Sequence, residues 1–260
     1  MGEVTGFWNT DAVRSATPRW TVTTWNVQGS KGTDIDRVVD VLSASAPDIV
    51  LLQEVRRPQA NAIASRLDMV HEWTFKHHAF FPLIGGRAEG AAILTPHGLY
   101  GRGSQVISST RWRRWWRRRV AQWGVVRRGD HSAYRVINAH LSPHDLRAER
   151  REEADEIVAI AERLGQAPPL IVGGDFNDHG DPEPIERLPG TEHVPSPPTN
   201  PAEAPVNVLD HVLLPADALD VELTVPDGGE QWEGVSDHLP VTVSFSMRWV
   251  TGDYAADTSN

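Results

Sequence analysis

Apolar residues along the chain fall into short runs that have the spacing of strands and of amphipathic helices. The strands predicted from these runs cover residues 19–27, 47–55, 91–94, 120–126, 133–141, 170–172, 208–214 and 241–245. The predicted helices cover residues 33–44, 58–67 and 145–164. The first begins with a capping-box pattern, in which Thr33 is followed three residues later by Asp36, and the third ends at Gly165.

The order of these elements favours one fold class. Several strands follow one another without a helix between them, which does not suit a simple parallel doubly wound sheet. We therefore expect an α/β fold in which two packed mixed sheets form a sandwich with helices on the outside. Residues 19–247 are predicted to form a single domain, since they contain no repeat and no low-complexity linker. Residues 1–18 are expected to be an N-terminal lead-in and residues 248–260 a polar C-terminal tail.

Composition narrows the class of protein. The 260 residues are 40% hydrophobic and 23% charged, as in ordinary soluble globular proteins. No apolar run is long enough to span a membrane, and the first residues lack the pattern of a secretory signal. The chain contains no cysteine, which excludes disulfides, thiolate metal sites and cysteine nucleophiles. We expect a cytoplasmic protein. Its formal charge of -10 disfavours nucleic-acid binding unless a local basic patch compensates.

Polar residues stand at the ends of six of the apolar runs. These groups are Thr24 to Gly29, Leu52 to Val55, Asn138 to Leu141, Gly174 to Asn177, Leu209 to His211 and Ser236 to Pro240. They supply carboxylates, carboxamides and imidazoles at strand ends. Phosphodiester hydrolysis needs a divalent cation, an activated water and donors for the phosphoryl oxygens. The six groups together therefore favour a metal-assisted phosphate-ester hydrolase.

Three of these residues are candidate metal ligands. Mg²⁺ prefers one or two carboxylates together with water and substrate oxygens. Glu54, at the end of an apolar strand, is expected to supply the main carboxylate, and Asp237 to complete the metal shell. Asn26 can hold the metal or a phosphate oxygen through its amide. Taken alone, Glu54 also fits a surface glutamate, and Asn26 a turn asparagine.

Asp175 and Asn177 follow the apolar strand that ends in Gly173 and Gly174. The glycines permit a sharp turn, and the i, i+2 spacing puts both side chains on one side of extended backbone. Asp175 suits orienting and deprotonating the attacking water, and Asn177 suits hydrogen bonding to the developing negative charge.

A calcium-binding loop is the rival interpretation of this segment. Asp175, Asn177, His179, Gly180 and Glu186 match its positions one, three, five, six and twelve, of which the sixth is the turn glycine. A strand rather than a helix precedes the segment, and prolines at positions 182 and 184 interrupt it. Both features argue against the calcium loop.

The histidines complete the candidate chemistry. His238 is placed to face the phosphate or its water, with Asp210 as the partner that fixes its tautomer. His140 is expected to contact the scissile phosphate or to protonate the leaving oxygen. Glu89 is a candidate partner that raises the basicity of His140, although glutamates before strands are common on surfaces.

These residues resemble the signatures of the endonuclease/exonuclease/phosphatase superfamily, the deoxyribonuclease-I-like fold, from about Trp20 to Phe245. The matching motifs are Trp25-Asn26, Gln53-Glu54, His140-Leu141, Gly174-Asp175-Phe176-Asn177, Asp210 and Ser236-Asp237-His238. The resemblance implies a four-layer α/β sandwich that cleaves phosphoesters with Mg²⁺ or Mn²⁺. It also implies the roles already assigned: metal ligands at Glu54 and Asp237, and a His238–Asp210 pair.

Two departures from the family patterns bear on the substrate. Val55-Arg56 stands where abasic-site endonucleases usually have Thr-Lys, and His211 stands where many members have tyrosine. The signal and disulfides of the secreted deoxyribonucleases are also missing. The resemblance therefore indicates the reaction class and leaves the physiological substrate open.

A basic aromatic run covers residues 111–119, with six arginines and three tryptophans. Arginine makes bidentate phosphate contacts, and tryptophan offers a plane on which an unpaired base stacks. The favoured interpretation is a track for nucleic acid, with Arg113, Arg114, Trp115 and Arg117 binding the substrate. An anionic membrane interface is a second interpretation. A core-packing tryptophan face with solvated arginines is the third.

Three functions are consistent with the sequence. The first is a divalent-metal phosphodiesterase that cleaves DNA or RNA, with nucleic acid as its partner. The second is a phosphatase or a sphingomyelinase-like lipid phosphodiesterase with the same centre, acting at a phospholipid or membrane surface. The third is a catalytically silent binding module. No obligate protein partner is evident.

Overall fold

The computed structural model describes residues 18–78, 88–108, 118–130, 132–179 and 188–247. The expectations for residues 1–17 and for the C-terminal tail at 248–260 lie outside these residues. Arg113, Arg114, Trp115 and Arg117 lie outside them too, so their role in substrate binding stays a prediction.

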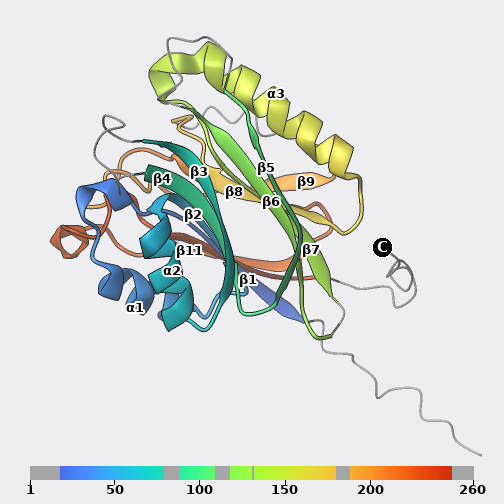
Figure 1. Ribbon diagram of the computed structural model, residues 1–260, viewed down its shortest axis with the longest axis horizontal. Helices are drawn as coiled ribbons and strands as arrows, with labels where there is room; N and C mark the ends of the chain where they lie inside the picture. The colour runs from blue at the N-terminus through green and yellow to red at the C-terminus, as the bar shows by residue number, and fades with distance from the viewer. Residues whose placement is uncertain (1–17, 79–87, 109–117, 131, 180–187, 248–260) are drawn as a thin grey trace, which may run out of the picture.

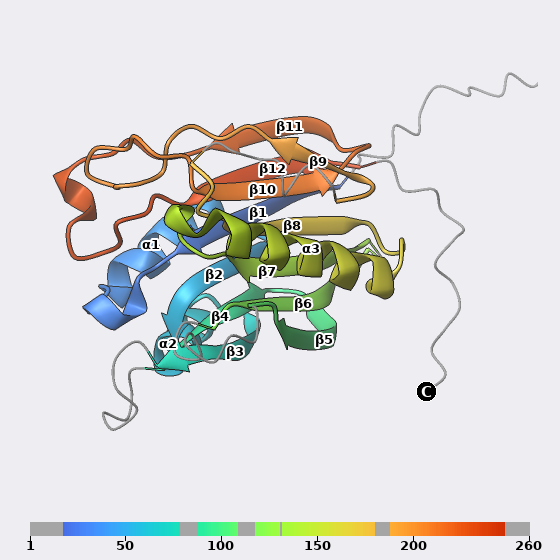
Figure 2. The ribbon, with the colours of Figure 1, turned by 90° about the horizontal axis from the view of Figure 1, so that it is seen from above.

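Two sheets of six strands each form the centre of the molecule (Figures 1 and 2). The first sheet contains, in spatial order, β11 (Leu219–Thr224), β12 (Val241–Ser246), β1 (Arg19–Asn26), β2 (Ile49–Arg56), β4 (Ala88–Thr95) and β3 (Val70–His78). The second contains β5 (Gly98–Val106), β6 (Val120–Arg127), β7 (Ala133–His140), β8 (Leu170–Asp175), β10 (Asp210–Pro215) and β9 (Thr191–Val194). The predicted pair of mixed sheets is confirmed.

Each sheet has one parallel pair near its centre. In the first sheet β1 runs parallel to β2, and in the second β7 runs parallel to β8, while the neighbouring pairs are antiparallel. The carboxyl ends of two parallel strands lie at the same edge. Asn26 is consequently level with Gln53, and His140 is level with Asp175.

Among the residues that the structure describes, three α-helices cover the outer faces of the sandwich. These are α1 (Ile35–Ser45), α2 (Arg57–Arg66) and α3 (Arg147–Leu164). Figure 1 shows α3 along one side of the sheets and α1 with α2 on the opposite side. Short 3-10 turns lie at Gly29–Lys31 (η1), His144–Leu146 (η3) and Glu230–Trp232 (η4).

The core follows the alternation of side chains along the strands. On β2, Val50 and Leu52 pack with α1 and α2, whereas Ile49 and Leu51 pack between the two sheets. A third cluster joins α3 to the outer face of the second sheet, through residues such as Ile157 and Val172. These three layers of apolar contact account for the four-layer α/β/β/α arrangement.

The start of α1 differs from the prediction. Its cap is Asp34, whose carboxylate accepts hydrogen bonds from the backbone N–H groups of Asp36 and Arg37. Thr33 instead donates to the carbonyl of Val27. The predicted capping box at Thr33 is therefore wrong, because a neighbouring aspartate caps the helix and ties up the same donors.

Four strands were not predicted: β3, β5, β9 and β11. They are the four edge strands of the two sheets. Most residues of β5 and β11 are at least partly exposed.

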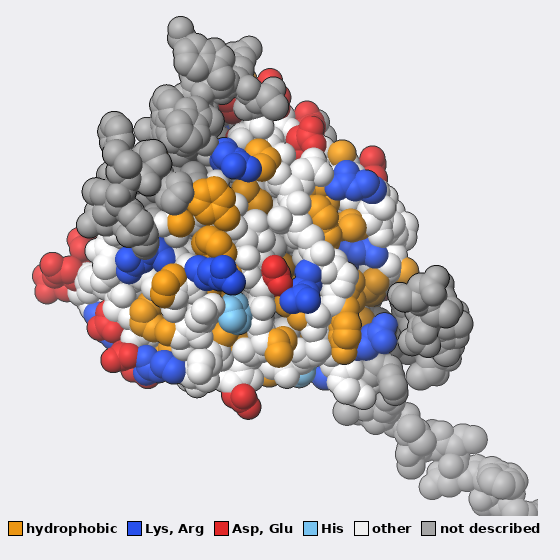
Figure 3. All heavy atoms as spheres, in the orientation of Figure 1, with side chains coloured by type: hydrophobic (Ala, Val, Ile, Leu, Met, Phe, Trp, Pro, Cys, Tyr) orange, Lys and Arg blue, Asp and Glu red, His pale blue; other side chains and the backbone are white. Residues whose placement is uncertain are grey.

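Figure 3 shows basic and apolar side chains mixed on one face of the molecule. In the part of the chain that the structure describes, no helix is both long and apolar enough to cross a bilayer.

Candidate active site

A bulge in β2 sets the direction of Glu54. Between the pairs Leu52–Ala92 and Val55–Gly90 the register shifts, so two residues of β2 face one residue of β4. Glu54 lies in this bulge with a φ of 53°, in the left-handed region. A bulge re-aims the side chain that it carries. It puts Glu54 3.7 Å from Nδ1 of His140, which belongs to the other sheet.

Beneath the site, a buried amide pair joins the two sheets. Nε2 of Gln53 donates to Oδ1 of Asn138 at 2.8 Å, and also to the hydroxyl of Thr24 at 3.0 Å. Nδ2 of Asn138 donates to the carbonyls of Leu52 and Ala92. Both amides are fully buried. They hold the ends of β2 and β7 in a fixed relation.

A close approach of two strands places Asp175. Gly174, on β8, has a φ of 156°, and an added Cβ would lie 1.8 Å from the carbonyl oxygen of Ala139 on β7. Only glycine permits that approach. Two hydrogen bonds orient Asp175 and Asn177 toward the end of β7. The backbone N–H of Asn177 donates to the carboxylate of Asp175, and Nδ2 of Asn177 donates to the carbonyl of Leu141 at 3.1 Å.

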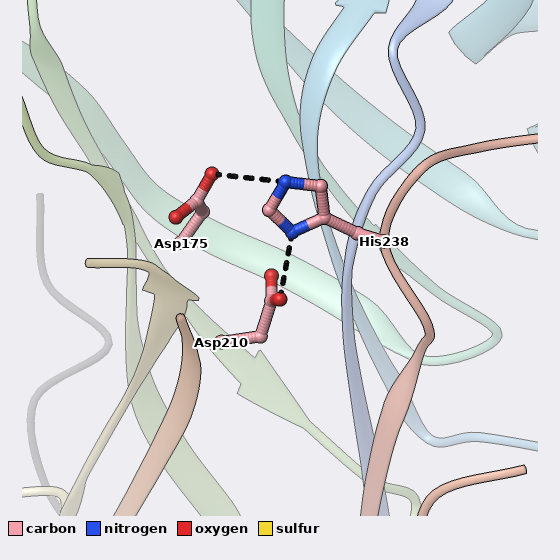
Figure 4. Close-up of side chains that lie close together, drawn as sticks. All are labelled: Asp175, Asp210 and His238. Atoms are coloured by element: carbon pink, nitrogen blue, oxygen red, sulfur yellow. Dashed lines mark hydrogen bonds and ion pairs between the residues drawn. The ribbon is translucent and has the colours of Figure 1, made fainter. Parts of the chain in front are cut away.

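His238 lies between two buried carboxylates (Figure 4). Its Nδ1 is 2.8 Å from Oδ2 of Asp210, and its Nε2 is 3.8 Å from Oδ2 of Asp175. The hydroxyl of Thr199 donates to the same oxygen of Asp210 at 2.6 Å. The structure thus brings His238 and Asp210 together as the sequence predicts.

Charge decides the protonation of His238. Burial on its own would lower the pKa of the imidazole, but Asp210, Asp175 and Asp237 outweigh burial and raise the pKa to about 10. His238 is consequently an imidazolium near neutral pH.

The pKa of Asp175 is also raised, but here burial is the main cause. Burial raises the pKa of this carboxyl to about 6, and the negative charges of Asp210 and Glu54 act in the same direction. The imidazolium of His238 and a 2.9 Å hydrogen bond from Asn26 partly offset that rise. A pKa near the working pH is what a general base requires.

Asp175, Asp210 and His238 lie close enough to hold a cation, since their ligand atoms are within 4.8 Å of one another. Nδ1 of His238 is hydrogen-bonded to Asp210, and its Nε2 faces Asp175, so the same group also suits proton handling.

Asp237 and Glu54 fit a metal better. Oδ1 of Asp237 is buried, and within the described residues it has no hydrogen-bond partner. Its other oxygen accepts from Gln28 and lies 3.8 Å from Lys31. Nε2 of His238 lies 3.8 Å from this Oδ1, beyond hydrogen-bond distance. A carboxylate oxygen that accepts no hydrogen bond suits a hard cation. Asn26 lies near both carboxylates along the chain. Ser236, next to Asp237, donates to the carbonyl of Asn26, and Gln53, next to Glu54, is paired with Asn26 in the sheet. That these three residues share one ion stays a prediction.

Lys76 is a site residue that the sequence did not reveal. It lies on the edge strand β3, and its side chain is only 3% exposed. Its Nζ is 3.0 Å from Nδ1 of His140 and 3.5 Å from Oε1 of Glu54. Burial and the charge of Arg119 lower its pKa to about 8, against the opposing effect of nearby carboxylates such as Glu54 and Glu89. Because β3 was not among the predicted strands, no pattern in the sequence placed Lys76 near these residues.

His140 contacts residues from both sheets. Besides Lys76 and Glu54, its Nε2 lies 3.5 Å from Asp175 and 3.3 Å from Nδ2 of Asn177. Its predicted partner Glu89 interacts with Ser30, Glu54, Lys76 and Arg119. Burial and Glu54 raise the pKa of Glu89. The pairing of Glu89 with His140 stays a prediction.

The calcium loop gains no support from the elements around Asp175. The residues before it form strand β8 rather than a helix. Residues 180–187 lie outside the described part of the chain.

A hollow of about 310 Å³ lies beside Asp237. Its lining includes the apolar residues Ala202, Trp232 and Val235 and the charged residues Lys31 and Glu233. It provides room for a substrate group next to the predicted metal ligand.

The chain matches a protein family described as the Endonuclease/Exonuclease/phosphatase family over residues 23–238. The protein belongs to this family. Membership places the chain among the phosphoesterases, and it agrees with the resemblance that the strand-end residues indicate. No curated protein matches the chain.

Solved structures share the fold at low sequence identity. An endonuclease/exonuclease/phosphatase from Beutenbergia cavernae is 19% identical with a TM-score of 0.70, and the match covers 88% of this chain and 72% of that one. The human Nocturnin catalytic domain is 18% identical with a TM-score of 0.68, over 89% and 94% of the two chains. A mannosyl-6-phosphatase from Bacteroides thetaiotaomicron is 18% identical with a TM-score of 0.65, over 88% and 100%. All three are similar in fold.

Proposed function

We propose that the protein is a Mg²⁺- or Mn²⁺-dependent phosphodiester hydrolase that cleaves DNA or RNA with an activated water. The observation that carries the proposal is the position of Asp175, which lies between His140 and His238 at the junction of the two sheets. One buried carboxylate with a pKa of about 6 thus adjoins two imidazoles and two amides.

The residues divide the reaction between them. Asp175 orients a water and takes one of its protons as the water oxygen bonds to phosphorus and the bond to the leaving oxygen breaks. Asn177 and His140 face the phosphoryl oxygens, and the imidazolium of His238, held by Asp210, balances the negative charge that develops. A metal ion bound by Glu54 and Asp237, with Asn26, would polarise the phosphate.

Arginines near the site favour a nucleic acid substrate. Arg119, the last residue of the basic aromatic run, is buried, and its charge acts on Lys76 and Glu89. Arg119, the residue at which the run ends, therefore lies near Lys76 and Glu89. Phosphates that flank the scissile bond are the groups that a string of arginines would bind.

A phosphatase is the second candidate, and the hollow beside Asp237 favours it. Its lining combines apolar residues with residues of both charge signs, so it suits a compact neutral group such as a sugar better than a polyanion. A mannosyl-6-phosphatase is among the structures that share the fold.

A substrate panel tests these alternatives. Purified protein would be assayed with Mg²⁺, with Mn²⁺ and with EDTA on plasmid, single-stranded DNA, RNA, sugar phosphates, inositol phosphates and sphingomyelin. We expect metal-dependent cleavage of nucleic acid, abolished by EDTA. Asp175→Asn and His238→Ala should each reduce the rate by about 10²-fold or more. Asp217→Asn, at an exposed turn outside the site, is the matched control.

Each alternative outcome has a definite meaning. Turnover of sugar phosphates alone would show that the protein is a phosphatase and not a nuclease. Turnover of sphingomyelin alone would indicate a lipid phosphodiesterase. If no phosphoester were turned over with either metal, the catalytically silent binding module would be the remaining interpretation. Undiminished rates in Asp175→Asn and His238→Ala would refute the assigned centre.

A further inference from the structure

Lys76 is a buried cation in contact with the candidate site. The chain has two lysines, and the other, Lys31, is 69% exposed. Lys76 is almost fully enclosed, and its ammonium lies 3.0 Å from Nδ1 of His140 and 3.5 Å from Glu54. A buried ammonium is unfavourable unless its donors are satisfied. Carboxylates at Glu54, Glu89 and Asp175 favour its charged form.

The contact with Lys76 determines which nitrogen of His140 carries a proton. An ammonium group only donates hydrogen bonds, so a charged Lys76 requires Nδ1 of His140 to be the acceptor. A neutral imidazole that accepts at Nδ1 has its hydrogen on Nε2. Nε2 of His140 lies 3.5 Å from Oδ2 of Asp175 and 3.3 Å from Nδ2 of Asn177.

Asn177 is oriented independently of His140. Its Nδ2 lies 3.1 Å from the backbone carbonyl of Leu141, which only accepts, so the NH₂ group is the side of the amide that faces this region. Nε2–H of His140 and Nδ2–H of Asn177 are therefore two donors 3.3 Å apart. Two donors do not bond to each other. In this tautomer, a phosphoryl oxygen placed between them would accept from both.

We propose that Lys76 is a positioning residue that holds His140 in the Nε2–H tautomer, so that His140 and Asn177 together donate to a phosphoryl oxygen. In this state His140 stabilises the developing charge and does not protonate the leaving oxygen. The inference rests on the proposed phosphoester hydrolysis, but the tautomer itself is measurable without any substrate.

The decisive measurement is a long-range ¹H–¹⁵N correlation spectrum of the imidazoles in metal-free, ¹⁵N-labelled protein. The signals of His140 would be identified by their loss in His140→Gln. We expect wild-type His140 to be protonated at Nε2 and unprotonated at Nδ1. In Lys76→Met the signals should shift toward a mixture of tautomers. Lys31→Met, which removes the other lysine, should leave the His140 signals where they are.

Two spectral results would overturn the proposal. One is a wild-type His140 that carries its proton on Nδ1 or on both nitrogens. The other is a His140 pattern that is unchanged in Lys76→Met. Lys76→Gln is a second variant, in case methionine prevents folding, and circular dichroism would report the fold of each.

A kinetic test separates positioning from packing. Lys76→Met should lower kcat by about 10²-fold, with a smaller change in KM, since a donor to the developing charge is lost. The chain has no cysteine, so Lys76→Cys can be alkylated at a single position in denaturant and refolded. Aminoethylation restores an ammonium and should restore both the His140 tautomer and most of kcat. Methylthiolation of the same cysteine fills space without charge and should restore neither.

The outcomes also distinguish this proposal from the proposed function. A tautomer that depends on Lys76, in a protein that turns over no phosphoester, would reject the hydrolase and retain the positioning role of Lys76. A rate that falls in Lys76→Met while the tautomer stays the same would reject the positioning role and retain the hydrolase. Equal rescue by both cysteine modifications would show that Lys76 only fills space.

Discussion

At the scale of single residues, the site depends on carboxyl and imidazole groups whose protonation is set by their neighbours. His238 is the clearest case. Its Nδ1 bonds to Asp210 at 2.8 Å, and Asp175 faces its other nitrogen. The two carboxylates belong to neighbouring strands and are directly opposite in the antiparallel pair of β8 and β10. The imidazolium between them separates two negative charges that would otherwise repel each other.

Removal of one of these charges should alter both the titration of His238 and catalysis. In Asp210→Asn we expect the pKa of His238 to fall from about 10, because the carboxylate that most raises it is gone. The rate should fall by about 10²–10⁴-fold, since the ring loses the partner that orients it. An NMR titration of metal-free protein and initial-rate measurements check the two effects. Asp217→Asn is the control, and an unchanged His238 titration in Asp210→Asn would contradict the pairing.

The same pKa predicts a dependence of stability on pH. A histidine whose pKa is raised in the folded state stabilises the fold fully below its unfolded pKa, about 6.5. That contribution is lost as the pH rises through about 10. We therefore expect the free energy of unfolding of metal-free protein to decrease between these pH values. Urea unfolding at several pH values measures it. A decrease just as steep in His238→Gln would assign the effect to another group.

Site residues at strand ends could be predicted from the sequence, but Lys76 could not. His140, Asp175 and Asp210 each follow or end an apolar run, and strands that lie side by side bring such ends together. Lys76 lies within an edge strand of the first sheet, and His140 ends a central strand of the second. Their 3.0 Å contact arises from the packing of one sheet on the other. No spacing along the chain encodes that packing.

At the scale of elements, the exposure of a strand determines whether it can be predicted from the sequence. Central strands such as β2 and β7 are buried on both faces and appear as apolar runs. The edge strands β5 and β11 are mostly exposed, so their sequences lack that signal. A charged pair between Arg102 on β5 and Glu72 on β3 lies where the two sheet edges meet. Charged residues at edges disfavour pairing with other chains.

The junction of β7 and β8 provides a test at this scale. Gly174→Ala should destabilise the fold by about 2 kcal/mol or more, because its φ is 156° and a Cβ would collide with the carbonyl of Ala139. It should also lower activity, since Asp175 is the next residue. Gly129→Ala is the matched control: its Cβ meets nothing within 4 Å, and we expect little change. Thermal unfolding compares the two. Equal stability of both variants would show that β8 adjusts to the added methyl group.

At the scale of the whole molecule, the site exists only where the two sheets meet. Glu54 and Asn26 come from the first sheet, and His140, Asp175 and Asp210 come from the second. Most of the contact between the sheets is apolar and has no preferred direction. Gln53 and Asn138 add a directional contact at the end nearest the site. We expect this pair to help fix the register of one sheet on the other at the candidate site.

A double-mutant cycle tests this role. Gln53→Leu and Asn138→Leu should each destabilise the fold by about 1–3 kcal/mol, because each leaves buried polar groups unpaired. The double variant should cost less than the sum, since the two residues are hydrogen-bonded to each other. Each single variant should also reduce kcat, because His140 lies two residues beyond Asn138.

The control is a hydroxyl pair within one sheet, Thr23 and Thr242, whose oxygens are 2.9 Å apart. Thr23→Val and Thr242→Val change a contact between β1 and β12 and leave the contact between the sheets intact. We expect them to affect stability without a matching loss of kcat. If the amide variants lowered stability but left kcat unchanged, the apolar core alone would hold the two sheets in catalytic register. If they lowered kcat without loss of stability, the amide pair would act on the site directly rather than through the packing of the sheets.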